Sequence, residues 1–339
     1  MVGPASSRIR TIADLASLAG VSAGTVSRAL AGKAEVNEET RRRIEALAAQ
    51  HGFRPNQMAS RLRRGRTRVV GVVVPLGHEK RQHLSDPFFM AILAQLADAL
   101  TENGYDIMLS RVIPDDPGWL DRIATSGMLD GVMLIGQSNE HEAIERLARD
   151  YLPLVAWGVA LPGQRHCAIG SDNAAGGRLA GDHLIERGAR RLAFLGDVRA
   201  PEFRFRYEGV CAAARAARLP MPLQLNAHLA SDIMEHEIEA HLPELLEAGV
   251  DGLAAASDLL AVTALRQLKA RGISVPGRIR VTGYDDLPIA AHSVPPLTTV
   301  AQNILLGARE MVSALFRRID GEETSSLQFA PALVVRTST

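Results

Sequence analysis

Short apolar runs alternate with amphipathic stretches along most of this chain, beginning at Val69. The first series predicts strands at 69–75, 105–110, 131–136 and 153–158 and a helix over 87–104. The second series predicts strands at 190–197, 250–257 and 279–286 and helices over 179–188 and 205–219. Apolar strands separated by such helices are typical of parallel sheets covered on both faces. Two series therefore predict an α/β body of two doubly wound parallel-sheet subdomains, with a cleft where strand ends converge.

The segment before this body predicts three short helices between residues 11 and 53. Their expected N-caps are Thr11, Ser22 and Asn37. Ala16, Gly20 and Val26 have the spacing of a helix-turn-helix. The small alanine lets two helices cross closely, the glycine makes the turn, and the valine fills the gap between them. This spacing predicts a DNA-binding module.

The charge of the chain is unevenly distributed, although its formal net charge is zero. Residues 1–68 contain thirteen Lys and Arg against five Asp and Glu, whereas the rest holds twenty-five basic and thirty-three acidic residues. A small basic segment on an acidic body indicates a polyanion-binding module joined to a body with another task. Charge alone leaves a merely solvated, Arg-rich surface as the alternative.

Several protein classes are disfavoured by what the sequence lacks. Cys167 and Cys211 lie far apart without metal-ligand spacing, so we expect reduced thiols. The sequence has no apolar signal segment and no run of about 18 uncharged apolar residues. It also lacks a phosphate-binding loop, a dinucleotide fingerprint and a Gly-x-Ser-x-Gly elbow. We therefore predict a cytoplasmic, non-membrane protein that is not an enzyme, with no catalytic residue, cofactor or metal site.

Longer motifs cover nearly the whole chain. The run TIADLASLAGVSAGTVSRAL and its continuation to residue 67, together with IGSDNAAGGRLAGDHL, GYDD and PPLTTVAQN, resemble the LacI/GalR (lactose-repressor) family. The resemblance implies a helix-turn-helix headpiece and a periplasmic-binding-protein-like body, with three strands crossing between its subdomains. The implied domains are a headpiece at 1–57, a hinge helix at 55–67, an N-subdomain at 68–171 and 303–332, and a C-subdomain at 172–302 and 333–339.

In that family the second headpiece helix lies in the major groove of DNA. The resemblance places base reading on Ala23, Gly24 and Arg28, of which Arg28 can present a bidentate fork to guanine. Nearby Ser and Thr side chains are candidates for phosphate contacts, with helix capping as the alternative. The predicted DNA-binding residues are Thr11, Ser22, Ala23, Gly24, Thr25, Ser27, Arg28, Asn37, Asn56, Ala59, Leu62 and Arg63.

The stretch from Pro55 to Gly65 resembles the family's hinge helix. Proline suits its start and glycine its end, but the helix is too short to be stable alone in water. In the family it folds on operator DNA beside its dimer mate, and the leucine matching Leu62 wedges into the minor groove. A plain basic linker is the alternative interpretation.

The resemblance also implies an effector site between the two subdomains. The segment 85–89 matches a pocket-lining segment, Arg206 an arginine that grips ligand hydroxyls or carboxylate, and Asp285 an acidic hydrogen-bond acceptor. Independently, sugar sites combine aromatic faces with planar hydrogen-bonding groups. Core packing remains open for the aromatic residues, and helix capping for Asp258. The predicted effector-binding residues are Asp86, Phe88, Phe89, Trp157, Arg206, Asp258 and Asp285.

Three features depart from the family pattern or from a minimal fold. Val159 stands where many relatives carry a basic or aromatic ligand contact, and Ser257 where asparagine is frequent. The effector therefore cannot be transferred from any single relative. The polar segment 75–85 is longer than a strand–helix connection needs, and it is either a lip on the cleft or an ordinary exposed loop.

Together these features predict a homodimer that binds a pseudo-palindromic operator and represses genes of carbohydrate uptake or utilisation. A small-molecule effector, expected to be a sugar, would change how the subdomains close and so alter the spacing of the paired hinges. A nucleobase or a sugar phosphate acting as corepressor is the alternative effector. A solute-binding protein without a regulatory role is the alternative function.

Overall fold

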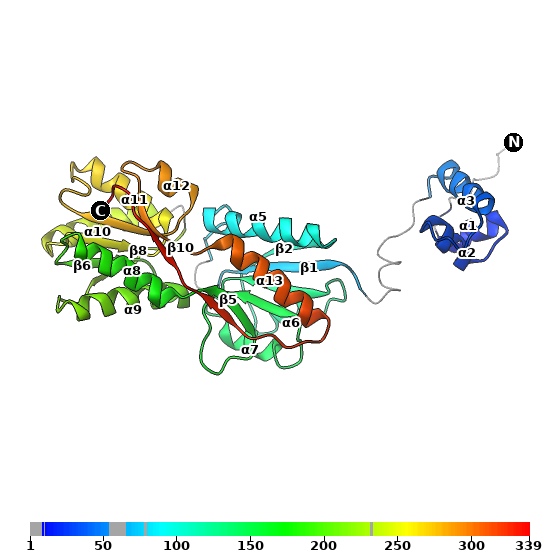
Figure 1. Cartoon of the computed structure of the whole chain (residues 1–339), viewed down its shortest axis with the longest axis horizontal. Helices are drawn as coiled ribbons and strands as arrows, with labels where there is room; N and C mark the ends of the chain where they lie inside the picture. Colours follow the sequence, from blue (N-terminus) through cyan, green and yellow to red (C-terminus); the bar gives the residue numbers. More distant parts are fainter. Residues whose placement is uncertain (1–8, 10, 54–65, 78–79, 231–232) are drawn as a thin grey trace. The chain divides into compact units, whose positions relative to one another are not determined.

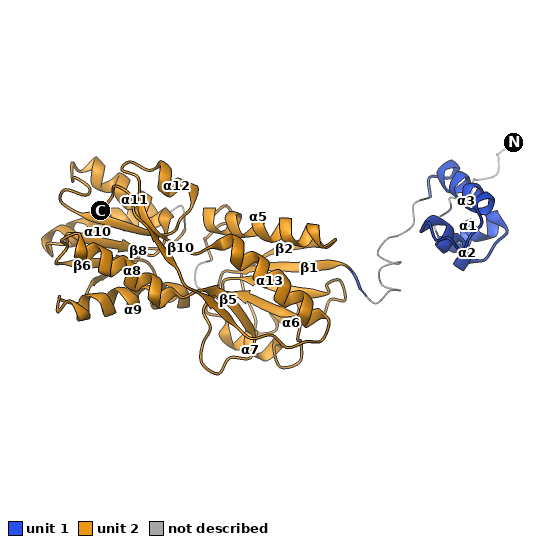
Figure 2. Ribbon diagram, in the orientation of Figure 1, with its two compact units in different colours: residues 1–67 blue, residues 68–339 orange. Residues whose placement is uncertain are grey.

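The computed structural model describes residues 9, 11–53, 66–77, 80–230 and 233–339. The chain divides into two compact units, residues 1–67 and 68–339, which we call the headpiece and the body (Figure 2). The predicted hinge contacts Asn56, Ala59, Leu62 and Arg63 lie outside the described residues.

The headpiece contains helices α1 (Ile12–Ala19), α2 (Ala23–Leu30) and α3 (Glu38–Gln50). Each begins at its predicted N-cap, which satisfies an otherwise unpaired backbone N–H. The Thr11 hydroxyl accepts from the Asp14 N–H at 3.1 Å, and the Asp14 carboxylate accepts from the Thr11 N–H at 2.9 Å. Ser22 accepts from the Thr25 N–H at 3.1 Å, and Asn37 caps α3 in the same way. These contacts confirm the predicted helix starts.

The three helices enclose a small apolar core. Leu15, Val26 and Ile44 are fully buried, one from each helix. Gly20 ends α1 at φ +66°, a left-handed conformation that lets the chain turn directly into α2. The predicted helix-turn-helix is therefore present, with Val26 filling the space between the helices.

The first sheet of the body has the strand order β11-β5-β4-β3-β1-β2, and all its pairs are parallel. Its strands are β1 (Val69–Pro75), β2 (Asp106–Val112), β3 (Gly131–Ile135), β4 (Leu154–Trp157), β5 (Cys167–Ser171) and β11 (Leu327–Phe329). Its helices are α5 (Pro87–Glu102), α6 (Trp119–Ala124), α7 (His141–Leu147) and α13 (Ile304–Ile319). Alternate strand residues such as Val72 and Val73 enter separate cores, one beneath α5 and α13 and one beneath α6 and α7.

The second sheet has the strand order β12-β10-β9-β8-β6-β7. Its strands β6, β8 and β10 are labelled in Figure 1. Its strands are β6 (Leu192–Leu195), β7 (Leu223–Leu225), β8 (Gly252–Ala255), β9 (Arg280–Asp285), β10 (Thr298–Ala301) and β12 (Ala332–Val334). Its helices are α8 (Asn173–Glu186), α9 (Pro201–Ala216), α10 (Met234–Glu247), α11 (Asp258–Ala270) and α12 (Pro288–His292). Only the terminal strand departs from the predicted parallel arrangement, because β12 pairs antiparallel with β10.

The chain passes between the two sheets three times, after β5, after β10 and between β11 and β12. Residues 69–171 and 327–329 supply the strands of the first sheet, and residues 192–301 and 332–334 those of the second. We refer to the parts around these sheets as the first and second subdomains. The sheet that each strand joins supports the boundaries expected from the sequence, which we retain as a proposal.

Helices α8 and α9 pack with almost no space between their backbones. A Cβ atom at Gly177 would collide with the carbonyl oxygen of Arg206, and one at Gly209 with the carbonyl oxygen of Ala174. One at Gly176 would collide with the hydroxyl of Tyr284. Only glycine permits this close approach of the two helices. The approach fixes the position of α9, and so of Arg206, relative to β9.

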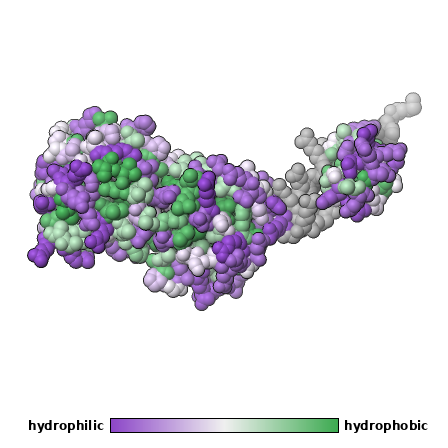
Figure 3. Space-filling view, viewed as in Figure 1, coloured by the Kyte–Doolittle hydropathy of each residue, from purple (hydrophilic) through white to green (hydrophobic). Residues whose placement is uncertain are grey.

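Polar residues cover most of the visible face of the body, and apolar residues gather in patches between them (Figure 3). Among the helices that the structure describes, none combines the length and apolar character needed to cross a bilayer.

Candidate functional site

A cavity lies between the subdomains, at the carboxyl ends of strands from both sheets. The first subdomain contributes Leu76 after β1, Gly136 after β3 and Trp157 from β4. The second contributes residues that follow β6, β7 and β8, and Asp285 at the end of β9. This position is the one that parallel α/β folds generally use for binding.

One wall of the cavity is aromatic. Phe88 lies 6.1 Å from both Phe89 and Trp157, measured between ring centroids. Asp86 sets this wall in place, because its carboxylate caps α5 by accepting from the Phe88 N–H at 2.9 Å. The three aromatic rings line the cavity and also pack against the core of the first subdomain. Core packing and cavity lining are therefore not exclusive here.

Arg206 lies opposite, on the second turn of α9, and its side chain is almost fully buried. Its Nε donates to the Asn173 side-chain oxygen at 2.7 Å, and one terminal nitrogen donates to the Ala256 carbonyl at 2.5 Å. The guanidinium also lies over the Tyr284 ring, 3.7 Å from its centroid. These partners hold Arg206 in a single orientation at the cavity wall.

Asp285 ends β9 in an unusual backbone conformation. Its φ is +118° and that of Asp286 is +54°, both rare for residues that carry a side chain. Its carboxylate accepts from the Gln302 amide at 2.5 Å and lies 3.7 Å from the Arg206 guanidinium. Burial raises the pKa of Asp285 well above its usual range, against the lowering effect of Arg206.

Asp258 does not line the cavity, contrary to the expectation that it contacts the ligand. It is fully buried at the start of α11, and its carboxylate accepts from the Leu287 N–H at 2.8 Å and the Thr299 hydroxyl at 2.5 Å. Ser257 caps the helix instead, and Ser257 lines the cavity. Burial raises the pKa of Asp258 to about 7. Its position indicates that it joins α11 to the β9–α12 loop and to β10.

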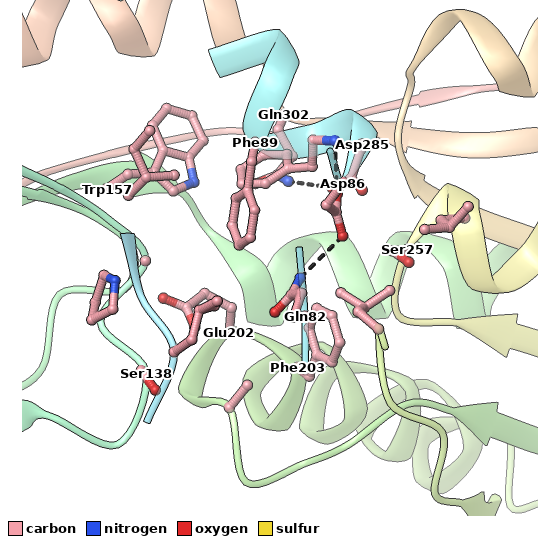
Figure 4. A pocket seen from close by; sticks show the side chains of 18 of the residues that line it. Gln82, Asp86, Phe89, Ser138, Trp157, Glu202, Phe203, Ser257, Asp285 and Gln302 are labelled. Atoms are coloured by element: carbon pink, nitrogen blue, oxygen red, sulfur yellow. Dashed lines mark hydrogen bonds between the residues drawn. The ribbon is translucent and has the colours of Figure 1, made fainter. Parts of the chain in front are cut away.

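Among the described residues, five polar side chains that line the cavity were not predicted as effector contacts: Gln82, Ser138, Glu202, Ser257 and Gln302 (Figure 4). Gln82 is buried and donates to the Asp86 carboxylate at 3.0 Å. Arg111 holds this part of the chain by donating to the carbonyls of Lys80 and Gln82. The described residues of the long polar segment therefore include part of the cavity wall, and the length of that segment was the available signal.

Glu202 lies in the first turn of α9, where an acidic residue is ordinarily explained by the helix dipole. Its carboxylate reaches across to the first subdomain, since a Cβ at Gly158 would lie 2.7 Å from its Oε1 and 2.6 Å from the Gln137 amide nitrogen. Burial raises the pKa of Glu202. Because the helix dipole already explains an acidic residue at this position, nothing in the sequence indicated that Glu202 lines the cavity.

Helix α2 of the headpiece presents the start of its first turn and, in its last turn, Arg28 to solvent. Ala23, Gly24 and Arg28 are exposed, and Arg28 lies 3.7 Å from Glu35. Ser22 and Thr25 are hydrogen-bonded to each other at 2.9 Å while Ser22 caps the helix. Thr11 and Asn37 are likewise used as caps, which leaves their role toward DNA a prediction. Arg28 is therefore the exposed side chain on this helix best suited to contact a base edge.

A helix-turn-helix unit joined to a two-subdomain body with a polar and aromatic cavity defines a ligand-responsive, DNA-binding regulator. Comparison with known proteins agrees. Residues 11–56 match the family described as bacterial regulatory proteins, lacI family, and residues 181–339 match a periplasmic binding protein-like domain. Among the described residues, no group of His, Cys, Asp and Glu is arranged to hold a metal ion.

Similar proteins match nearly the whole chain. The HTH-type transcriptional regulator CelR of Thermobifida fusca is 32% identical, over 97% of this chain and 98% of its own. The HTH-type transcriptional repressor CytR of Escherichia coli K12 is 27% identical, over 93% of this chain and 92% of its own. The chain belongs to the LacI family of bacterial regulatory proteins, and it is a transcriptional regulator and not an enzyme.

Two solved structures are similar to this chain in fold. A CelR–cellobiose complex is 31% identical with a TM-score of 0.68, covering 98% of this chain and all of its own. A lac repressor dimer bound to operator and the anti-inducer ONPF is 22% identical with a TM-score of 0.81, covering 97% of this chain and 98% of its own. The predicted family and fold class are both confirmed.

Proposed function

We propose that the protein is a repressor whose affinity for its operator depends on a sugar bound in the cavity. The observation that carries this proposal is the pairing of an aromatic wall with the fixed polar groups of Arg206 and Asp285. Sugars offer apolar ring faces and a fixed pattern of hydroxyls, which such a combination can bind. The CelR complex contains cellobiose, and the ribose operon repressor of Bacillus subtilis is 28% identical. These relatives favour a sugar as the effector and genes of carbohydrate uptake or utilisation as the targets.

On DNA, each headpiece would occupy one half-site of a pseudo-palindromic operator, with α2 in the major groove. We retain the predicted contacts of α2 and of the caps Thr11 and Asn37. The hinge contacts Asn56, Ala59, Leu62 and Arg63 rest on the sequence alone. An operator-binding protein of this kind would act in the cytoplasm, where chromosomal DNA is located.

Half-site recognition of this kind requires a homodimer, and the first subdomain offers a surface for it. Met90 on α5, Leu109 on β2 and Ile113 just beyond it are 48%, 42% and 39% exposed. Strand β2 is also the edge of its sheet. Exposed apolar side chains beside a free strand edge favour association with another copy.

The cavity offers a route by which ligand and DNA binding can be coupled. Its walls come from both subdomains, so a ligand that bridges them changes the free energy of closing one against the other. That change would be transmitted through the first subdomain to the hinge that precedes β1. The coupling must be reciprocal and is typically about 1–3 kcal/mol, which corresponds to a change of about 5- to 150-fold in operator affinity.

The test combines a ligand screen with DNA binding. Purified protein would be screened by thermal shift against cellobiose, ribose and other mono- and disaccharides. Each stabilising sugar would then be added to a fluorescence-anisotropy titration with upstream DNA at fixed salt. A sugar that raises the melting temperature and shifts operator affinity supports the proposal. If DNA binds and no sugar alters either quantity, the sugar-sensing role is wrong and the DNA-binding role stands.

A further inference from the structure

The ionisable groups of the cavity are mostly acidic. Asp86, Glu202 and Asp285 all line it, from different segments of the chain. Arg206 is the only basic residue among the described residues that line it. The cavity therefore offers a bound molecule more acceptors than positive donors.

Arg206 is not a free cation. Its hydrogen bonds to Asn173 and Ala256 use two of its donors, and its charge is already matched by Asp285 at 3.7 Å. A phosphate site instead needs an uncommitted guanidinium or ammonium group, or a cluster of backbone N–H groups. The arrangement around Arg206 is suited to donating one or two hydrogen bonds to a hydroxyl.

Two acceptor atoms near the ligand space have no hydrogen-bond partner among the described residues. The Glu202 Oε1 atom is buried without a hydrogen bond, and so is the Gln302 Oε1 atom. The orientation of Gln302 follows from its partner, because the Asp285 carboxylate accepts from its nitrogen and leaves its oxygen for another donor. A buried acceptor without a partner is costly, and a ligand O–H or N–H group would satisfy both atoms.

We propose that the cavity selects an uncharged, hydroxyl-rich sugar, tolerates an amino sugar, and rejects phosphorylated and carboxylated sugars, with Glu202 as the main determinant. This inference rests on the proposed function, namely that the cavity binds a sugar. It assigns Glu202 a binding role and decides against the sugar phosphate that the sequence left open.

The physical reason is charge repulsion in a buried site. An anionic group placed near Glu202 and Asp285 would be repelled in a medium that screens charge poorly. Burial raises the pKa values of Asp86, Glu202 and Asp285, so proton uptake would relieve part of this repulsion. Proton uptake would add no further basic group, and two donors of Arg206 would stay committed to Asn173 and Ala256. A neutral hydroxyl avoids both penalties.

The experiment compares matched ligands on the full-length protein. The series are glucose, glucosamine, glucose 6-phosphate and gluconate; ribose and ribose 5-phosphate; and cellobiose and cellobionate. Thermal shift identifies the series that binds, and calorimetry then gives the ratio of the anionic to the neutral dissociation constant. The variants are Glu202→Gln, which keeps the shape and removes the charge, and Glu208→Gln on the same helix, whose side chain is 55% exposed.

We expect the anionic member to bind at least about tenfold more weakly than its neutral parent to the wild type. Glu202→Gln should reduce that ratio by about tenfold, and Glu208→Gln should leave it unchanged. Since the ratio is taken within one protein, a general loss of affinity in a variant does not change it.

A phosphorylated or carboxylated sugar that binds the wild type as tightly as its parent would overturn the inference while leaving the proposed sugar-sensing function intact. An unchanged ratio in Glu202→Gln would remove Glu202 as the determinant. Failure of every sugar to bind, with DNA binding retained, would overturn the proposed function and this inference together.

Discussion

Replacing Arg206 by alanine tests the cavity most directly, because that side chain connects the site to the fold. Arg206 is 4% exposed and hydrogen-bonds to Asn173 and to the Ala256 carbonyl. A hydrogen bond to a charged group contributes about 1.5–3 kcal/mol, so two give about 3–6 kcal/mol. Proton uptake by Asp285 would offset part of this loss. We therefore expect Arg206→Ala to lower the free energy of unfolding of the body by about 3–5 kcal/mol.

The assay can observe the body alone. The two tryptophans of the chain, Trp119 and Trp157, both lie in the first subdomain, so urea unfolding followed by tryptophan fluorescence reports on the body and not on the headpiece. Effector titrations and operator binding would be measured without urea, at a temperature at which the variant is folded. We expect the effector response to be lost while operator affinity stays within about threefold of the wild type, because Arg206 lies outside the headpiece.

Two further variants separate the causes. Arg204→Ala removes an exposed arginine of the same helix, paired only loosely with Glu208 at 3.9 Å, and should change stability by less than about 0.5 kcal/mol. Arg206→Lys keeps the positive charge but loses the planar fork that reaches Asn173 and Ala256, so it should recover part of the stability and little of the effector affinity. The reasoning is refuted if Arg206→Ala costs under 1 kcal/mol or responds to effector at wild-type concentrations.

Three further predictions concern other parts of the chain. Burial raises the pKa of Asp258 to about 7, so the folded body binds this proton more tightly than the unfolded chain, and stability from this source falls as pH rises. In urea titrations, the free energy of unfolding of the wild type should fall by about 2 kcal/mol between pH 5.5 and 7.5, relative to that of Asp258→Asn. Parallel pH profiles of the two proteins would contradict this. Arg28→Ala should weaken specific operator binding by about 1–3 kcal/mol in gel-shift titrations, whereas Arg42→Ala, an exposed arginine on α3, should change it far less; equal effects would argue against base reading by Arg28. Leu62→Ala should weaken specific operator binding strongly and leave effector affinity unchanged, and an unaltered operator affinity would reject the predicted hinge contact.

Local chemistry made much of the fold predictable. The caps Thr11, Ser22 and Asn37 each satisfy a backbone N–H within three residues, so their effect depends on adjacent sequence alone. Most central strands of the body are largely apolar runs because both faces of each sheet are covered, and this pattern predicted them. The central strands β5 and β10 contain Ser or Thr and were not predicted. The short terminal strands β11 and β12 have exposed or half-buried residues, so no such run identified them.

The cavity was only partly predictable, because its polar groups come from segments that are distant in sequence. Glu202 and Gln302 belong to different connections of the two sheets, and each has an ordinary local explanation where it stands. Asp258 shows the opposite case. It directly follows a strand, where ligand contacts are common, but its carboxylate points to Leu287 and Thr299 instead of the cavity. Side-chain direction at a strand end depends on tertiary packing, which residue order alone does not specify.

Because the chain crosses between the sheets three times, neither subdomain of the body is a single continuous segment of the sequence. Residues 68–171 end before α13 and β11, so a fragment of that length would lack one of the two helices that cover one face of its sheet and the strand at its edge. Removing α13 would expose the side chains that pack against Met311 and Leu315. The helices of the headpiece, in contrast, come from one uninterrupted segment. A chimera could therefore exchange the headpiece through a single junction in the chain. Exchanging one subdomain of the body would instead require a junction at each point where the chain crosses between the sheets.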